Sequence, residues 1–389
     1  MADPHIVGWA HTKFGKSEAA GTEALMAEVV GPALAHAGVG AGDLDGIFVG
    51  CYNNGFQKQD FQAALVAMGT PGLEYVPAVR MENACATGSA ALYSAMDFIA
   101  SGRGRIALVV GAEKMTAIPG NEVGDVLLTA CYREEEADVA GGFAGVFGKI
   151  ANSYFQQHGD RSAELAMIAA KNHENGMRNP LAHMQKDFGF DFCNTVSEKN
   201  PLVAGPLRRT DCSLVSDGAA ALVLADAETA AQMQRAIRFR ARAHVNDFLA
   251  LSRRDPIAFE GPRRAWAKAL EQAGLSIRDL SVVETHDCFT VAEMLEYEAM
   301  GLAERGEGWR AIRDGVTRFD GALPVNPSGG LKSRGHPIGA TGVSQHVMMA
   351  MQLMGEAGAM QVAGANLGGV FNMGGAAVTS YVSIMERAK

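Results

Sequence analysis

The chain has 389 residues, of which 48% are hydrophobic and 20% are charged, and its formal net charge is −9 at pH 7. A chain this long and this apolar can bury more than one core, which excludes an intrinsically disordered protein. The negative charge argues against a nucleic-acid partner, because phosphate contacts need a basic surface. Glycine is more frequent than usual, with 46 residues, but it follows no Gly-X-Y period, so collagen is excluded.

Nothing in the sequence predicts a membrane span or an export signal. The longest apolar runs, such as Ile106–Val110 and Ala219–Ala225, have the length of strands rather than of membrane helices. The first residues lack the basic and apolar regions of a signal peptide. Six cysteines are scattered without a CxxC pair, which is typical of reduced thiols. We therefore expect a cytoplasmic protein.

Short apolar runs alternate with Ala-rich stretches along most of the chain. The predicted buried strands are Gly46–Gly50, Ile106–Gly111 and Ala219–Ala225, and the predicted helices are Gly88–Ala100 and Gly261–Ala273. This alternation is typical of α/β proteins, in which helices cover a sheet.

One segment departs from the α/β pattern. From about residue 115 to 206 the chain is more polar and richer in Asn and Gln, and it includes Arg133-Glu-Glu-Glu136. We interpret it as an excursion from the first α/β unit that forms a lid or loop domain. A second α/β unit is expected after Ala225.

The two units share a weak internal repeat. Residues 79–92 are expected to form a strand, then Cys85, then a helix, and residues 282–295 to form a strand, then Cys288, then a helix. Two such units could bring both cysteines to a common face.

Cys85 lies before a predicted helix and is followed by small residues. The positive end of a helix dipole and its unpaired N–H groups favour a thiolate, the form of cysteine that acts as a nucleophile. The small neighbours leave room for a substrate carbonyl. The alternative interpretation is an ordinary buried cysteine, since free cysteines are often core residues.

His286 and Cys288 stand two residues apart in Glu284-Thr-His-Asp-Cys-Phe-Thr290. A zinc site is not expected, because the chain lacks both a CxxC pair and the HxE…PCxxC arrangement. The imidazole could instead donate a hydrogen bond to a developing oxyanion, and the thiol could shuttle a proton. The alternative is a half-buried histidine beside a core cysteine.

His336 lies in a segment dense in glycine and proline, residues 326–342. Such a segment fixes the backbone and permits close approach to a ligand. A histidine held there is a natural base for a thiol. The segment is not a Walker A motif, and the absence of GxSxG disfavours a serine hydrolase.

Three segments together resemble the thiolase family: Asn83-Ala-Cys-Ala-Thr-Gly-Ser89, His286-Asp-Cys-Phe289 and Gly335-His-Pro-Ile-Gly-Ala-Thr-Gly342. The His-Asp-Cys-Phe segment is similar to the sterol-carrier-protein-2 type. Further similar segments extend the resemblance over nearly the whole chain in the family's order: Gly111-Ala-Glu-Lys-Met115, Lys171-Asn-His-Glu-Asn-Gly176 and Ser216-Asp-Gly-Ala-Ala220.

The resemblance implies a five-layer αβαβα fold built from two similar halves, with a loop domain over the active site. We place the N-terminal half at residues 1–230, including the excursion, and the C-terminal half at residues 231–389. It also implies a reversible Claisen-type exchange between 3-oxoacyl-CoA plus CoA and acyl-CoA plus acetyl-CoA, as in lipid and fatty-acid metabolism. Coenzyme A is then a co-substrate, with no tightly bound cofactor and no metal.

By the same resemblance, Cys85 is the nucleophile that carries the acyl group and His336 is the base that activates it. His336 and His286 line the hole for the enolate oxygen, and Cys288 moves a proton at C2 of the acetyl group. Stabilising the enolate and protonating it promptly is what makes C–C cleavage feasible.

We interpret the glycine-rich residues 366–375 as a loop. This loop departs from ordinary thiolases, which carry a catalytic cysteine there. Residues 366–375 offer two Asn-x-Gly registers, ending at Gly368 or Gly374. We prefer Gly374, because an expected strand over residues 376–384 then follows at the right distance. Its N–H, together with that of Cys85, is expected to form a second oxyanion hole.

Two rival functions remain. One is a retro-aldolase acting on a branched or steroid-like acyl-CoA, and the other is a non-catalytic acyl-CoA-binding scaffold subunit. The intact Cys85, Cys288 and histidines favour the thiolase. The resemblance implies a homodimer or homotetramer, whereas the sequence identifies neither the acyl chain nor the residues that contact CoA.

Overall fold

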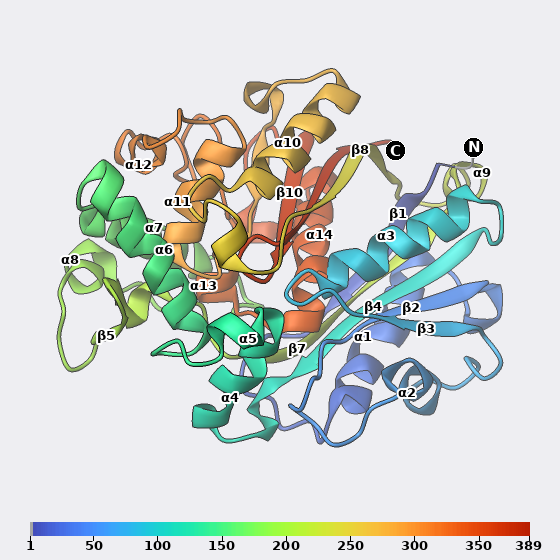
Figure 1. Cartoon of the computed structure of the whole chain (residues 1–389). Coiled ribbons are helices and arrows are strands. Elements are labelled where there is room, and N and C mark those ends of the chain that lie inside the picture. Colours follow the sequence, from blue (N-terminus) through green and yellow to red (C-terminus); the bar gives the residue numbers. More distant parts are fainter. Residues whose placement is uncertain (1–2) are drawn as a thin grey trace.

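This computed structural model describes residues 3–389 of the chain. The centre of the fold is a mixed sheet of nine strands. Its order is β3-β2-β4-β7-β1-β8-β11-β10-β9 (Figure 1). The strands are β1 (His5–His11), β2 (Gly46–Gly50), β3 (Ala78–Met81), β4 (Ile106–Lys114), β7 (Asp217–Ala225), β8 (Ile237–Asn246), β9 (Val282–Glu284), β10 (Leu367–Gly374) and β11 (Thr379–Arg387).

The sheet consists of two halves with the same pattern of strand directions. In the first half β2 is parallel to β3 and β4, while β7 is antiparallel to β4 and β1. In the second half β10 is parallel to β9, while β11 is antiparallel to β10 and β8. Within the sheet, the two halves are joined where β1 pairs with β8, at His5–Arg238 and Ile6–Ile237. The division at residue 230 lies between α9 (Ala227–Ala230) and β8, and it remains a proposal.

Helices separate and cover the two halves. Helices α3 (Thr87–Ala100) and α14 (Ile338–Met354) pack together between them. The outer face of the first half is covered by α1 (Thr22–Ala37) and α2 (Gln62–Gly69), and that of the second half by α10 (Glu260–Ala273). The alternation of a strand sorts the side chains of β4 between these layers.

Leu108 and Val110 of β4 pack toward α1, whereas Ala107 and Val109 face α3 and α14. The result is a helix–sheet–helix–sheet–helix arrangement, as the α/β pattern and the resemblance predict.

The segment between β4 and β7 leaves the sheet and forms most of the remaining helices. It contains α4 (Gly120–Leu127), α5 (Arg133–Glu136), α6 (Phe143–His158), α7 (Ser162–Gly176), α8 (Gly189–Asn194) and the short hairpin β5 (Leu202–Ala204)–β6 (Leu207–Arg208). The excursion expected at residues 115–206 lies inside this insertion. Helix α7 packs against α11 (Thr290–Ala299), α12 (Gly308–Arg313) and α13 (Gly330–Arg334) of the second half (Figure 1).

The expectation of a glycine loop at residues 366–375 is wrong for most of that segment. Residues 367–374 form the buried strand β10, paired on both sides with β9 and β11, and β11 begins at Thr379. Strand pairing overrides the low strand propensity of glycine here, because large neighbours occupy the missing side-chain volume. Met349 packs on Gly368, and Trp266 packs on Gly369.

The internal repeat also differs in detail from the expectation. Cys85 and Cys288 do follow strands and precede helices, but β3 and β9 hold different places in the two halves. In the first half β3 pairs in parallel with β2. At the equivalent position of the second half, Val325 forms an isolated parallel bridge with Val283 of β9. The counterpart of β3–Cys85–α3 is therefore Val325–His336–α14.

No helix among the described residues is both long and apolar enough to cross a bilayer.

Candidate active site

The N-termini of the two central helices bring Cys85 and His336 together. Each residue lies two positions before its helix, Cys85 before α3 and His336 before α14. The helices approach closely because glycines face each other at the crossing. A Cβ on Gly88 would come within 2.7 Å of the backbone nitrogen of Val343, and one on Gly342 would overlap the backbone nitrogen of Ser89.

His286 completes this group from the turn after β9. The Cys85 thiol and one ring nitrogen from each of His286 and His336 all lie within 4.8 Å of one another. The two imidazole rings meet edge to face, with centroids 5.1 Å apart and planes at 84°. All three residues are buried.

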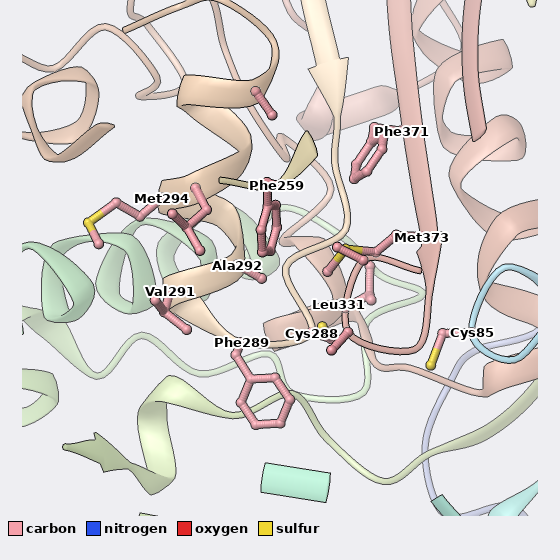
Figure 2. Close-up of a cluster of buried hydrophobic side chains, with 14 of the residues drawn as sticks. Cys85, Phe259, Cys288, Phe289, Val291, Ala292, Met294, Leu331, Phe371 and Met373 are labelled. Atoms are coloured by element: carbon pink, nitrogen blue, oxygen red, sulfur yellow. The ribbon is translucent and has the colours of Figure 1, made fainter. Parts of the chain in front are cut away.

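A cavity of about 900 Å³ opens onto this group. Cys85, Cys288 and His336 line it, and His286 lies behind them with no exposed surface. The insertion supplies apolar walls, including Val123 and Leu127 of α4. Figure 2 shows Cys85, Cys288 and Phe289 at one end of a buried apolar cluster. The two cysteines therefore share one face, as the sequence predicts.

Burial, rather than the helix terminus, dominates the ionisation of Cys85. Desolvation raises the pKa of its thiol to about 12, and only part of this effect is offset by the backbone N–H groups of Gly375 and of Cys85 itself. The backbone N–H of Cys85 at the helix N-terminus favours the thiolate, as expected, but its effect is smaller than that of burial. A nucleophilic Cys85 needs a base to take its proton as it attacks.

His336 is placed to be that base. Burial, with a smaller contribution from the nearby positive charge of Arg334, lowers the pKa of its imidazole to about 3, so the ring is neutral. Nδ1 lies 2.7 Å from the Thr341 hydroxyl, which donates its own hydrogen to the Pro337 carbonyl. The hydroxyl oxygen therefore accepts from Nδ1–H, and Nε2 keeps its lone pair.

Cys288 is held by the turn that carries His286. Its N–H donates to the His286 carbonyl, and its own carbonyl accepts from the Ser213 N–H, both at 2.9 Å. Burial and then the neighbouring Cys85 raise the pKa of its thiol well above the usual value, so Cys288 is protonated at rest.

The same turn is tied to α13 through Asp287. Its carboxylate accepts from the N–H groups of Leu331 and Lys332 at 2.6 and 3.1 Å and from the Asn172 amide at 2.7 Å. The turn with Cys288 and the segment that leads to His336 are thereby fixed relative to each other.

The two candidate registers of the glycine strand fall at opposite ends of β10. Gly374 lies against the Cys85 turn: a Cβ there would overlap the Asn83 carbonyl and come within 3.3 Å of the Ala86 nitrogen. Gly368 pairs with Val282 and Met385 at the far end, about 20 Å away along the strand. Of the two backbone N–H groups that lower the Cys85 pKa, one is its own and the other belongs to Gly375, the residue after Gly374. The oxyanion role of Gly374 remains a prediction.

Several residues of the site were not predicted from the sequence. Asn372 contacts both His286 and the Cys85 carbonyl, and Thr341 orients His336. Three exposed cations of the insertion, Lys186, Lys199 and Arg209, border the cavity. The sequence marks Asn372 only as the first residue of the Asn372-Met-Gly374 motif. That motif led us to predict a role for the Gly374 N–H and not for the side-chain amide of Asn372.

Comparisons with known proteins agree with this architecture. Residues 5–191 match the family model for the thiolase N-terminal domain, and residues 243–387 match that for the thiolase C-terminal domain-like family. The chain is 38% identical to an acetyl-CoA acetyltransferase of Methanothermobacter thermautotrophicus, with 100% of each chain covered.

More distant relatives give the same result. The chain is 33% identical to sterol carrier protein 2 of Homo sapiens, over 95% of this chain and 69% of that protein. A solved structure described as "Ltp2-ChsH2(DUF35) aldolase" superposes with a TM-score of 0.83 and covers 100% of this chain and 98% of the other. At 20% sequence identity, this similarity shows only that the two proteins share a fold. The chain belongs to the thiolase family.

Proposed function

We propose that this protein is a thiolase of the acetyl-CoA acetyltransferase type. It joins or cleaves the C–C bond between an acyl group and acetyl-CoA through an acyl group carried on Cys85. Thiolases act on CoA thioesters. The observation that carries the proposal is that Cys85, Cys288 and the free lone pair of His336 meet at the end of one apolar cavity.

In the acyl-transfer step, Cys85 Sγ attacks the carbonyl carbon of the acyl donor while its proton passes to His336 Nε2. The negative charge that develops on the carbonyl oxygen faces the backbone N–H groups around Cys85, with Gly374 or Gly375 as the second donor. Such preorganised donors stabilise a tetrahedral intermediate in a water-poor site. With an acyl-CoA donor the C–S bond then breaks, the departing CoA thiolate takes the proton from His336, and a thioester remains on Cys85.

In the C–C step, cleavage of a 3-oxoacyl-CoA releases acetyl-CoA as an enolate. Its oxygen lies toward the histidine pair, and the Cys288 thiol protonates C2. The raised pKa of Cys288 supports this role, because it keeps the thiol in the acid form that the enolate needs. In the condensation direction Cys288 first gives its proton to neutral His336, and the resulting thiolate takes the proton from C2 of acetyl-CoA. When the enolate attacks the thioester, the departing Cys85 thiolate takes the proton back from His336.

The nucleotide end of coenzyme A needs cations at the cavity mouth. Lys186, Lys199 and Arg209 are exposed and border the cavity, which supports contacts between this rim and the phosphates. The apolar walls from α4 suit the acyl chain or the pantetheine arm.

A retro-aldolase is the second candidate, because a solved aldolase shares this fold. It needs no acyl group on Cys85, so covalent acylation separates the two activities. A non-catalytic scaffold subunit would show neither acylation nor cleavage. The convergence of Cys85, Cys288 and His336 on one cavity, with His286 beside Cys85 and His336, favours the thiolase over both.

We further propose a homo-oligomer in a reducing compartment such as the cytoplasm. Exposed apolar side chains beside the edge strand β3 support self-association. All six cysteines are unpaired, which supports the compartment.

The test separates the two cysteines. After incubation with an acyl-CoA, mass spectrometry of the wild type should find the acyl group on the peptide that contains Cys85, and Cys85→Ala should abolish it. Cys288→Ala should still become acylated. It should lose C–C cleavage, and exchange of the acetyl-CoA methyl protons with deuterated water, by about 10²–10⁴-fold.

Cys193→Ala is the matched control, because Cys193 is equally buried but packs against Ala166 and Ala169 away from the cavity. It should retain both reactions. Acylation confined to a cysteine other than Cys85 would refute the proposal. Cleavage of 3-hydroxyacyl-CoA without acylation would favour the aldolase.

A further inference from the structure

Asn372, a fully buried residue of β10, makes three hydrogen bonds at the centre of the site. Its Nδ2 lies 3.2 Å from the Cys85 carbonyl oxygen and 2.9 Å from Nδ1 of His286. Its Oδ1 accepts from the Ser89 hydroxyl at 2.7 Å. The side chain thus links the nucleophile's turn, the first turn of α3 and the second histidine.

These partners leave one orientation for the amide. A backbone carbonyl oxygen can only accept a hydrogen bond, so the amide group facing Cys85 must be the NH₂. The same NH₂ faces His286 Nδ1, and an NH₂ can only donate. His286 Nδ1 must therefore present its lone pair, and a neutral ring then carries its proton on Nε2.

The other side of the His286 ring has no partner. Nε2 is buried and makes no hydrogen bond with any described residue. One of the two His286 ring nitrogens lies within 4.8 Å of the Cys85 thiol and of a His336 ring nitrogen. A buried N–H without a partner is costly, so such a donor is expected to have a ligand in the working protein.

We propose that Asn372 is a positioning residue that fixes His286 as an Nε2–H donor directed at the reacting group. Under the proposed function, on which this inference rests, that donor meets the enolate oxygen. Asn372 touches no substrate in this role and acts only through the proton on His286. Thr341 does the opposite for His336, so the two adjacent imidazoles carry opposite tautomers, one a base and the other a donor.

The arrangement has a second consequence for metal ions. Cys85, His286 and His336 are the ligand types that zinc prefers, and their donor atoms lie within 4.8 Å of one another. Ligation by His286 Nε2 needs a lone pair there and hence a proton on Nδ1. That proton would face the NH₂ of Asn372, donor against donor. Under this proposal Asn372 therefore disfavours binding of a divalent cation by Cys85, His336 and Nε2 of His286.

The decisive variant is Asn372→Asp, whose carboxylate accepts where the amide donates. It should draw the His286 proton to Nδ1 and leave a lone pair on Nε2. Asn372→Leu, which has a similar volume and no polar atom, serves as the second variant and should no longer hold the proton on Nε2. Ser89→Ala is the matched control: it removes a bond to the same amide but leaves both contacts of Nδ2.

The primary readout is ¹⁵N NMR of histidine-labelled protein, with the His286 signals assigned from a His286→Gln spectrum. We expect the proton on Nε2 in the wild type and in Ser89→Ala, and on Nδ1 in Asn372→Asp. The second readout is titration with Co²⁺, followed by thiolate-to-cobalt absorption. Asn372→Asp should bind Co²⁺ about 10–100-fold more tightly than the wild type.

The third readout is methyl-proton exchange, which should fall by about 10²–10³-fold in Asn372→Asp, the usual cost of one oxyanion donor. A His286 proton that stays on Nε2 in both Asn372 variants, or a wild type with the proton on Nδ1, overturns the inference. A moved proton with unchanged exchange upholds the role of Asn372 and instead removes His286 from the proposed mechanism.

Discussion

At the scale of single residues, burial decides the chemistry of the cysteines. A cysteine before a helix is expected to be acidic when it is open to solvent. At Cys85 the loss of hydration outweighs the helix terminus and raises the pKa of the thiol to about 12. Under the proposed function Cys85 therefore needs a base to remove its proton, and His336 is the residue proposed for that role.

This dependence predicts a two-part pH profile for alkylation of Cys85 by iodoacetamide. Attack assisted by His336 needs the neutral imidazole, whose pKa is about 3, so it should be independent of pH from about 5 to 9. Direct attack by the thiolate should rise tenfold per pH unit toward pH 12. His336→Ala should lose the flat part, with a rate at pH 7 at least ~10²-fold lower, and should converge with the wild type at high pH.

The control for this measurement is His173→Ala, because His173 also lines the cavity but is outside the Cys85–His286–His336 group. It should keep the flat region. Rates are read from mass spectrometry of the peptide that carries Cys85. An unchanged pH profile in His336→Ala would show that another group takes the proton.

Residue types and motifs were enough to predict Cys85, His286, Cys288 and His336 as a group, because each stands in a recognisable segment. The contact between Asn372 and His286 could not be predicted from the sequence. Asn372 meets His286 across 86 positions of sequence, and the meaning of its amide depends on which atom faces the ring. The thiol pKa was equally inaccessible, since local sequence gives the helix terminus but not the burial.

At the scale of elements, hydrophobic runs predicted the strands and helices that have ordinary composition. The strand β10 was missed because glycine carries little strand signal, and its partners β9 and β11 are fixed only by the tertiary fold. The insertion between β4 and β7 was recognised by its polarity, but its role as a wall of the cavity follows only from the packing of α4 and α6.

The ends of β10 give a prediction that separates the two glycine registers. Gly374→Ala and Gly368→Ala should each destabilise the protein by about 1–3 kcal/mol, because both sites are overpacked by a methyl group. Only Gly374→Ala pushes against the backbone of the Cys85 turn, whereas Gly368→Ala meets the flexible side chain of Met349.

Acylation of Cys85 should therefore fall by at least ~10-fold in Gly374→Ala and stay within about twofold in Gly368→Ala, at matched folded fractions. Denaturant unfolding gives the stabilities, and mass spectrometry gives the acylation rates. Equal effects of the two substitutions on acylation would remove the special role of the C-terminal end of β10.

At the scale of the whole molecule, the site exists because two similar halves meet along α3 and α14. One half supplies Cys85, the other supplies His286, Cys288 and His336, and the insertion closes the cavity over them. The family resemblance predicted that both halves contribute residues to the site. The order of the strands in the sheet shows which turns of the two halves are equivalent. The sequence repeat had paired Cys85 with Cys288, whereas topology pairs it with His336.

The exposed edge of the first half, at β3, is the site where we expect two copies of the chain to associate. Strand β3 lies at the edge of the sheet, and no strand within residues 3–389 pairs with its outer side. Phe61 and Met68 of the neighbouring α2 region are 75% and 71% exposed. Tyr75, in the loop between α2 and β3, is fully exposed, and Val79 on β3 itself is 43% exposed. An open strand edge flanked by such side chains favours pairing with a second copy of the chain. Light scattering after size exclusion should therefore give a dimer or larger oligomer for the wild type.

The double substitution Met68→Glu and Tyr75→Glu should shift this species to a monomer, because it introduces four repelling charges per dimer interface without removing any buried contact of the fold. Phe248→Glu is the matched control: Phe248 is 51% exposed but lies beyond β8 in the second half, so its oligomer should persist. A double variant that keeps the mass of the wild type would place the interface elsewhere. A wild type that is already monomeric at micromolar concentration would mean that the exposed edge of β3 has no partner copy.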